Sequence, residues 1–184
     1  MWLLILGWVL FLGAHLTPGV FGQRERLVAR LGEGRFTGLY IATSVTGMVC
    51  IIAGQKIAPF INVWNPPAWS RDAAGLLVLI GFILLFAMFL PTNLRRLTKH
   101  PMLAGIACWG TGHLLANGDL ASMLLFGGFT AFALICIVSL VNRGKTGDPK
   151  RYPWWRDVLV VVIGTAAYAL VLWLHPVLFG VAVI

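Results

Sequence analysis

The sequence predicts an all-α integral membrane protein, a bundle of about six transmembrane helices, from its composition and its length. Of its 184 residues, 59% are hydrophobic and only 11% are charged, and the mean hydropathy is +0.89. Soluble domains average about 25% charged residues, so this chain carries too little charge to cover a surface that faces water. At ~20 residues per crossing, the length allows about six or seven spans and leaves no room for a soluble catalytic domain. We therefore expect residues 1–184 to form a single transmembrane domain.

Six apolar stretches are the predicted spans, each bounded by charged residues or by clusters of proline and glycine. In chain order they are Trp2–Val20, Thr37–Ala58, Ala73–Leu90, Pro101–Ala116, Leu120–Val141 and Val158–Ile184. The first has no basic residue before its apolar run and no clear cleavage site after it, so we interpret it as a retained helix rather than a signal peptide. The fourth is the shortest, and the tight turn Asn117-Gly118-Asp119 separates it from the fifth.

The loops between these stretches predict the orientation of the bundle. Twelve of the 14 lysines and arginines lie in the first, third and fifth loops, and none lies in the fourth loop or at either end. The positive-inside rule therefore places the first, third and fifth loops in the cytoplasm and both termini outside it. Because these basic residues are spread over short loops rather than gathered on one exposed face, the net charge of +8 does not indicate a nucleic-acid-binding protein.

Four histidines are the residues best suited to carry chemistry. His15, His113 and His175 lie inside predicted spans, and His100 lies at the inner end of the fourth. An ionisable residue inside a span is by default a functional-site hypothesis. A proton relay is disfavoured, because all six carboxylates are expected in loops or in the tight turn. Neutral imidazoles without carboxylate partners suit the axial positions of an iron porphyrin.

A structural role is the alternative interpretation of these histidines. Pro18 follows three residues after His15, and Pro176 directly follows His175. A proline leaves a backbone carbonyl of its helix without a hydrogen-bond donor, and a neighbouring imidazole can supply one.

The most specific motif of the chain lies between residues 99 and 129. It contains His100-Pro101, then Trp109, then His113-Leu114-Leu115-Ala116-Asn117-Gly118. Together with His15-Leu16-Thr17-Pro18, this pattern resembles the NnrU family of bacterial inner-membrane proteins over most of the chain. The resemblance implies a multi-pass inner-membrane protein with a role in nitrite and nitric oxide respiration, that is, in denitrification.

The same histidines also resemble those of the 15-cis-zeta-carotene isomerase of plants and cyanobacteria, an integral membrane enzyme that uses haem b. This resemblance implies that His113 and His15 are the iron ligands. The isomerase pattern has a cysteine three residues before its second histidine, where this chain has Gly110, so exchange of the iron ligand to that cysteine is not available here. Trp109 lies one turn before His113 on the same face, and we expect it against the porphyrin.

Depths along the helices leave the pairing of the histidines open. At 1.5 Å per residue, His113 lies about 20 Å from His100 towards the outer face, whereas His15 lies about 8 Å from the inner face. If one iron joins His113 and His15, helix tilt or a first helix that ends later must compensate for a depth difference of roughly 10 Å. His175 matches the depth of His113 better, and a second haem between His15 and His100 would then follow. Because His100 and His113 are about 140° apart around their helix, we favour one haem, bound by His113 with either His15 or His175.

The sequence leaves four functions open. The first is a haem b protein that supports denitrification by electron transfer, gas sensing or reductase assembly. The second is a haem-dependent cis–trans isomerase of a polyene or isoprenoid lipid. The third is a membrane methyltransferase, because basic residues before His100-Pro101 and a glycine after them resemble the isoprenylcysteine methyltransferases; those enzymes, however, continue with an acidic, arginine-bearing segment that this apolar C-terminal stretch lacks. The fourth is a scaffold without cofactor. The expected partners are the lipid bilayer and either such a lipid or a respiratory membrane protein.

Overall fold

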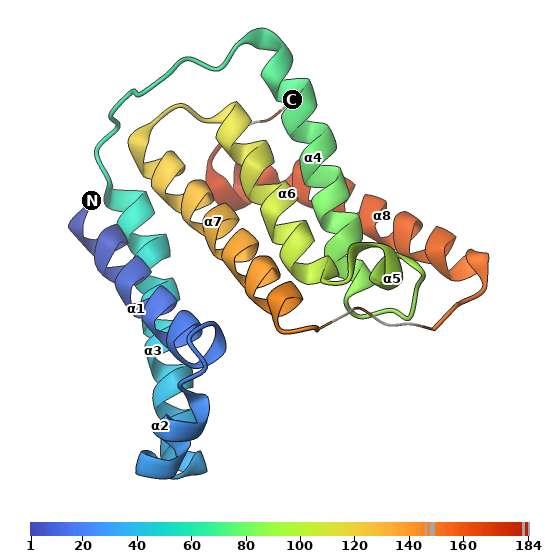
Figure 1. Cartoon of the computed structure of the whole chain (residues 1–184). Coiled ribbons are helices and arrows are strands. Elements are labelled where there is room, and N and C mark those ends of the chain that lie inside the picture. Colours follow the sequence, from blue (N-terminus) through green and yellow to red (C-terminus); the bar gives the residue numbers. More distant parts are fainter. Residues whose placement is uncertain (146, 148–149, 182, 184) are drawn as a thin grey trace.

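The structure is a computed structural model that describes residues 1–145, 147, 150–181 and 183. This part of the chain forms eight α-helices and no strand (Figure 1). The helices are α1 (Trp2–Gly19), α2 (Arg24–Leu31), α3 (Glu33–Ile57), α4 (Ala68–Ala87), α5 (Leu94–Thr98), α6 (Pro101–Ala116), α7 (Leu120–Asn142) and α8 (Trp154–Phe179). Within the described ranges, five of them are long and apolar enough to cross a membrane, namely α1, α3, α4, α7 and α8. The chain is therefore an all-helical protein with the composition of a multi-pass membrane protein.

The predicted fourth span is α6, and its bounds are those expected from the sequence. Its 16 residues extend about 24 Å, less than the ~30 Å hydrocarbon core of a bilayer. The five longer helices are thus the full-length candidates, and the count of six spans stays a prediction. A Cβ atom on Gly105 or Gly112 would come within 2.9 Å of a carbonyl oxygen of α4, so α6 lies in close backbone contact with that helix.

The second predicted span begins earlier than its apolar run. It starts at Glu33 rather than Thr37, because Gly32, with a φ of 78°, separates the short helix α2 from α3. A positive φ is readily adopted by glycine, so the chain can turn there and start a new helix at once. Neither α2 nor the other short helix, α5, was expected, since both are rich in arginine and lie outside the apolar stretches.

Two further spans also have shifted ends. The third begins at Ala68, directly after Pro67, and not at Ala73, because a proline before a helix fits its first turn while charged residues there remain at the membrane edge. The sixth ends at Phe179, because Gly180 adopts the left-handed conformation with a φ of 72°. Residues 182 and 184 of that predicted span lie outside the described residues.

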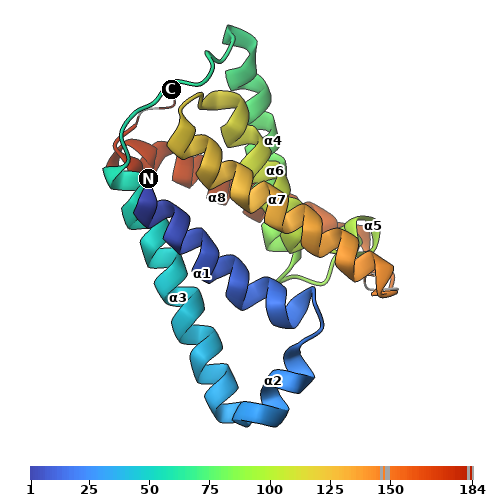
Figure 2. The same cartoon turned by 60° about the vertical axis from the view of Figure 1, so that its left-hand side comes forward.

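The helices follow one another as neighbours in the order α3, α1, α7, α6, α4 and α8. α1 and α3 form an antiparallel pair, and this pair contacts the other long helices through α7. Figures 1 and 2 both show the pair diverging from α7 towards the end that carries α2. The main core lies where α1, α3, α6 and α7 meet, and it includes Leu4, Trp8, Ile51 and Phe132.

Asp119 caps the N-terminus of α7, and its loss should have a measurable cost. Its carboxylate accepts a hydrogen bond from the backbone nitrogen of Ser122 at 3.0 Å. Asp119→Ala removes this acceptor, so we expect the free energy of unfolding to fall by about 1 kcal/mol and the melting midpoint in detergent to fall by about 2–4 °C. Asp119→Asn keeps an acceptor oxygen and should melt close to the wild type. Identical midpoints for the alanine variant and the wild type would contradict the capping role.

Candidate functional site

Aromatic rings from three helices meet around α7, and two of the four histidines lie among them. Phe126, Phe129 and Phe132 recur at every third residue of α7, so they lie near one side of that helix. They contact aromatic side chains of α1 and α6. We call this cluster the aromatic seam; it consists of Trp8, Phe11 and His15 of α1, Trp109 and His113 of α6, and Phe126, Phe129 and Phe132 of α7.

His113 lies at one end of the aromatic seam. Its ring stacks on Phe126 with centroids 4.4 Å apart, and the ring of Trp109 lies 5.0 Å from it. The Nδ1 atom of His113 is 2.9 Å from the carbonyl oxygen of Trp109, one turn earlier in α6. Trp109 in turn contacts Phe126 and Phe129. The imidazole is therefore held on two sides by aromatic rings and at Nδ1 by the backbone.

His15 lies at the other end of the seam in a matching arrangement. Its ring stacks on Phe11 at 4.1 Å, and the rings of Phe132 and Tyr40 lie 5.6 and 5.3 Å away. The Nδ1 atom of His15 is 2.8 Å from the carbonyl oxygen of Phe11, again one turn earlier. The carbonyl that Pro18 leaves free is that of Ala14, so His15 does not serve the proline-related role considered from the sequence.

Both imidazoles present the same chemistry. A carbonyl oxygen only accepts hydrogen bonds, so Nδ1 is the protonated nitrogen in each ring and Nε2 keeps its lone pair. Metal-binding histidines in proteins are held in this way, with one ring nitrogen on a backbone carbonyl and the other on the metal. His15 and His113 are thus oriented as potential ligands through Nε2.

The seam does not bring His15 and His113 together. His113 contacts Phe126 and His15 contacts Phe132, and these two phenylalanines are six residues, or about 9 Å, apart along α7. Phe129 lies between them and touches rings from both α1 and α6. Two imidazoles on one metal ion must each approach to about 2 Å. The packed seam therefore offers two separate donors rather than one pair.

His175 and His100 lie outside the seam. The Nδ1 atom of His175 is 2.8 Å from the carbonyl oxygen of Val181, beyond the end of α8. His100 precedes α6 at the opposite end from His113. Its Nε2 atom is buried and has no hydrogen-bond partner among the described residues. The ring of His175 contacts Phe179, outside the aromatic seam, and His100 lies at the far end of α6 from His113.

Comparison with known proteins assigns the chain to a family. The family model described as NnrU protein matches residues 3–183. The chain belongs to the NnrU family. This match confirms the family that the His100-to-Gly118 motif predicted. No curated protein and no solved structure matches the chain.

The donor groups of the aromatic seam in this NnrU-family chain suit haem, because each of its two histidines can supply one ligand to the iron. Imidazole is a common axial ligand of haem iron, and the ring-lined surroundings suit an apolar porphyrin. Within the described residues, no group of three or more histidine, cysteine or acidic side chains is placed to hold a metal ion. A metal at His113 would therefore need a cofactor that brings its own ligands. His15 and His113 contact different phenylalanines of α7, so one haem bound by both would require the packing around Phe129 to open.

The carboxylates of this NnrU-family chain lie near helix starts rather than in loops. Glu25, Glu33 and Asp72 belong to α2, α3 and α4, and Asp157 lies in the first turn of α8, whereas Asp148 is outside the described residues. The expectation that these carboxylates lie in loops is therefore corrected. The physical reason is that a helix N-terminus favours negative side chains. Within the described residues, the ion pair that forms joins Arg24 and Glu33, and no ion pair there involves a histidine.

Asp157 organises a polar network that the sequence did not lead us to expect. Its carboxylate accepts hydrogen bonds from the Thr92 hydroxyl, from the Asn93 backbone nitrogen at 2.8 Å and from Asn93 Nδ2 at 2.7 Å. Asn93 also exchanges two hydrogen bonds with the backbone of Tyr152. The sequence feature that could have indicated this network is Pro91-Thr92-Asn93, which directly follows an apolar run. This network joins the segment after α4 to the start of α8.

Proposed function

We propose that this protein binds haem b in the bacterial inner membrane and supports nitrite and nitric oxide respiration, with His113 as the main iron ligand. The observation that carries the proposal is the imidazole of His113, which lies among aromatic rings with Nδ1 on the Trp109 carbonyl and Nε2 available. Membership in the NnrU family supports the respiratory role.

The residues around His113 would orient the ligand rather than take part in the chemistry. The Trp109 carbonyl fixes the tautomer and the tilt of the imidazole, and the rings of Trp109 and Phe126 exclude water from it. Haem supplies one-electron chemistry and binding of gases such as nitric oxide. His175 and His15 are the candidates for a second ligand, and without one the iron would keep an open position.

The proposed orientation follows from the basic residues. In the proposal, α2, α5 and the segment between α7 and α8 face the cytoplasm, and both termini face the periplasm. The arginines and lysines of these three segments are the support for this orientation. A respiratory membrane protein is the proposed partner, in keeping with membership in the NnrU family.

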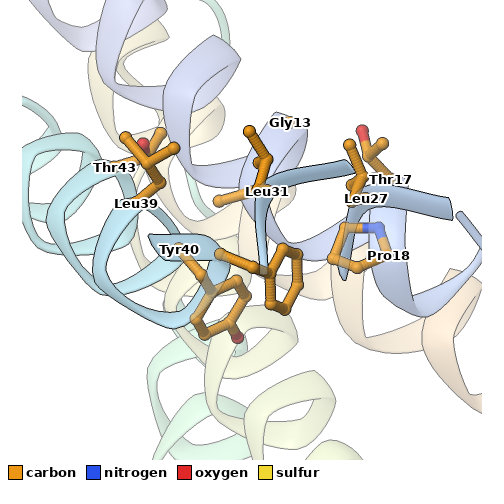
Figure 3. Close-up of a pocket in the computed structure, with 10 residues that line it drawn as sticks. Gly13, Thr17, Pro18, Leu27, Leu31, Leu39, Tyr40 and Thr43 are labelled. Atoms are coloured by element: carbon orange, nitrogen blue, oxygen red, sulfur yellow. The ribbon is translucent and has the colours of Figure 1, made fainter. Parts of the chain in front are cut away.

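A second candidate function is a haem-dependent cis–trans isomerase of a polyene or isoprenoid lipid. The observation in its favour is an apolar groove between α1, α2 and α3 that reaches Tyr40 (Figure 3). The ring of Tyr40 lies 5.3 Å from that of His15. Conversion of an added cis-carotene by membranes that contain the protein would favour this function. Unchanged carotene together with a nitric-oxide-sensitive haem spectrum would favour the respiratory one.

The absorption spectrum of the detergent-purified protein is the direct test of haem binding. We expect a Soret band, α and β bands after reduction with dithionite, and about one haem per chain in a pyridine haemochrome assay. The protein should be produced in cells supplied with a haem precursor, so that the cofactor is not limiting. A colourless protein from such cells would refute the proposal and favour the scaffold or methyltransferase interpretation.

A further inference from the structure

The groove between α1, α2 and α3 lies at the α2 end of the helix pair (Figure 3). Its volume is about 260 Å³. Its walls include Gly13 and Pro18 of α1, Leu27 and Leu31 of α2, and Tyr40 and Thr43 of α3. Most of this lining is apolar. The groove touches the aromatic seam through Tyr40 and is otherwise a separate feature.

One wall of the groove is an amphipathic helix. Leu27 and Leu31 of α2 lie one turn apart and line the groove. Arg26 and Arg30 form a parallel row about 100° further around the same helix. Both arginines are exposed, and neither forms an ion pair with a described residue. An apolar row beside a cationic row is the pattern of a helix that lies in the membrane interface.

Arg24 lies beside the groove, next to the lining residue Phe36. Its guanidinium pairs with Glu33, and it lies 5.7 Å from the ring centroid of Phe36, another groove residue. This arginine is therefore already neutralised by a carboxylate. Arg26, Arg30 and Arg35 are exposed and form no ion pair with a described residue, and of these Arg26 and Arg30 belong to the helix that lines the groove.

The depth of the groove matches one leaflet of a bilayer. Thr43 lies ten residues beyond Glu33, the first residue of α3, which is about 15 Å along the helix. Half of a hydrocarbon core of ~30 Å is also about 15 Å. A groove that runs from the interfacial helix α2 to Thr43 is thus deep enough for an acyl chain of one leaflet.

We propose that this groove binds one anionic phospholipid, with an acyl chain against Leu27 and Leu31 and the phosphate at Arg26 and Arg30. Charge complementarity supports this occupant, because residues 24–35 contain four arginines and two glutamates. The cytoplasmic leaflet, where the basic residues predict α2 to lie, carries a negative surface potential. The bound lipid holds α2 against the α1–α3 pair, and its binding does not depend on haem.

Native mass spectrometry of the full chain tests the proposal. The protein is equilibrated with vesicles that contain equal amounts of phosphatidylglycerol and phosphatidylcholine, and the retained lipid is identified. We expect one phosphatidylglycerol per chain, enriched at least about fivefold over phosphatidylcholine, because each interfacial arginine contributes about that factor. The double variant Arg26→Gln, Arg30→Gln should retain the two lipids equally.

A matched pair of glycine variants tests the groove itself. A Cβ atom on Gly13 meets nothing within 4 Å, and the same is true of Gly38, which does not line the groove. Gly13→Phe should therefore fold, fill the groove and lose the retained lipid, while Gly38→Phe should keep it. Arg71→Gln, on α4, should also keep it. Lipid retention by Gly13→Phe, or equal retention of both lipids by the wild type, would overturn the proposal.

Discussion

Replacing His113 by alanine should leave the purified protein without haem. The imidazole Nε2 is the proposed iron ligand, and the neighbouring rings of Trp109 and Phe126 offer no other donor. Loss of a residue that only supports a ligand lowers metal affinity about 10–100-fold, so loss of the ligand itself should lower haem affinity by at least about 100-fold. The measurement is haem per chain by pyridine haemochrome, together with circular dichroism to show that the variant is folded.

Three variants make this result specific to His113. His100→Ala removes the histidine at the other end of α6 and should leave the haem content unchanged. His15→Ala and His175→Ala should each retain haem, and the one that removes a second ligand should change the spin state seen in the Soret region. His113→Gly should regain haem when imidazole is added. A His113→Ala protein with full haem occupancy would exclude His113 as the ligand.

The helices themselves could be predicted because their signal is local. The first and fifth spans end within one residue of their predicted ends, since the apolar run and the helix coincide there. Where charged residues extend a helix, as at Glu33, the apolar run is shorter than the helix. The reason is that backbone hydrogen bonds form the helix, whichever side chains it carries. Hydropathy therefore locates a span but does not define the first turn of its helix.

The arrangement around the histidines could be predicted only in part. The depth offset between His15 and His113, roughly 10 Å from helix lengths, is close to the ~9 Å between their contacts along α7. The role of α7 could not be foreseen, because Phe126, Phe129 and Phe132 look like ordinary apolar residues in a span. Their contacts with α1 join residues more than 100 positions apart, and such pairs depend on the order of the helices.

Replacing Asp157 by alanine should cause the largest loss of stability among single substitutions of polar side chains at the end of the bundle where α8 begins. The carboxylate is the acceptor for the Thr92 hydroxyl, which is fully buried, and for two nitrogen atoms of Asn93. Without it these donors lose their partner, at a cost of about 2 kcal/mol in the free energy of unfolding. For a chain of this length that corresponds to a fall of about 4–8 °C in the melting midpoint.

A second acidic residue provides the control for Asp157. Asp72 also lies in the first turns of a long helix, but its side chain is exposed, so Asp72→Ala should melt close to the wild type. Asp157→Asn keeps one acceptor oxygen and should melt between the wild type and Asp157→Ala. Hydrogen exchange should increase at Asn93 and Tyr152 in the alanine variant, because this network joins their two segments. Equal melting of Asp157→Ala and Asp72→Ala would show that the network adds nothing to the stability of the bundle.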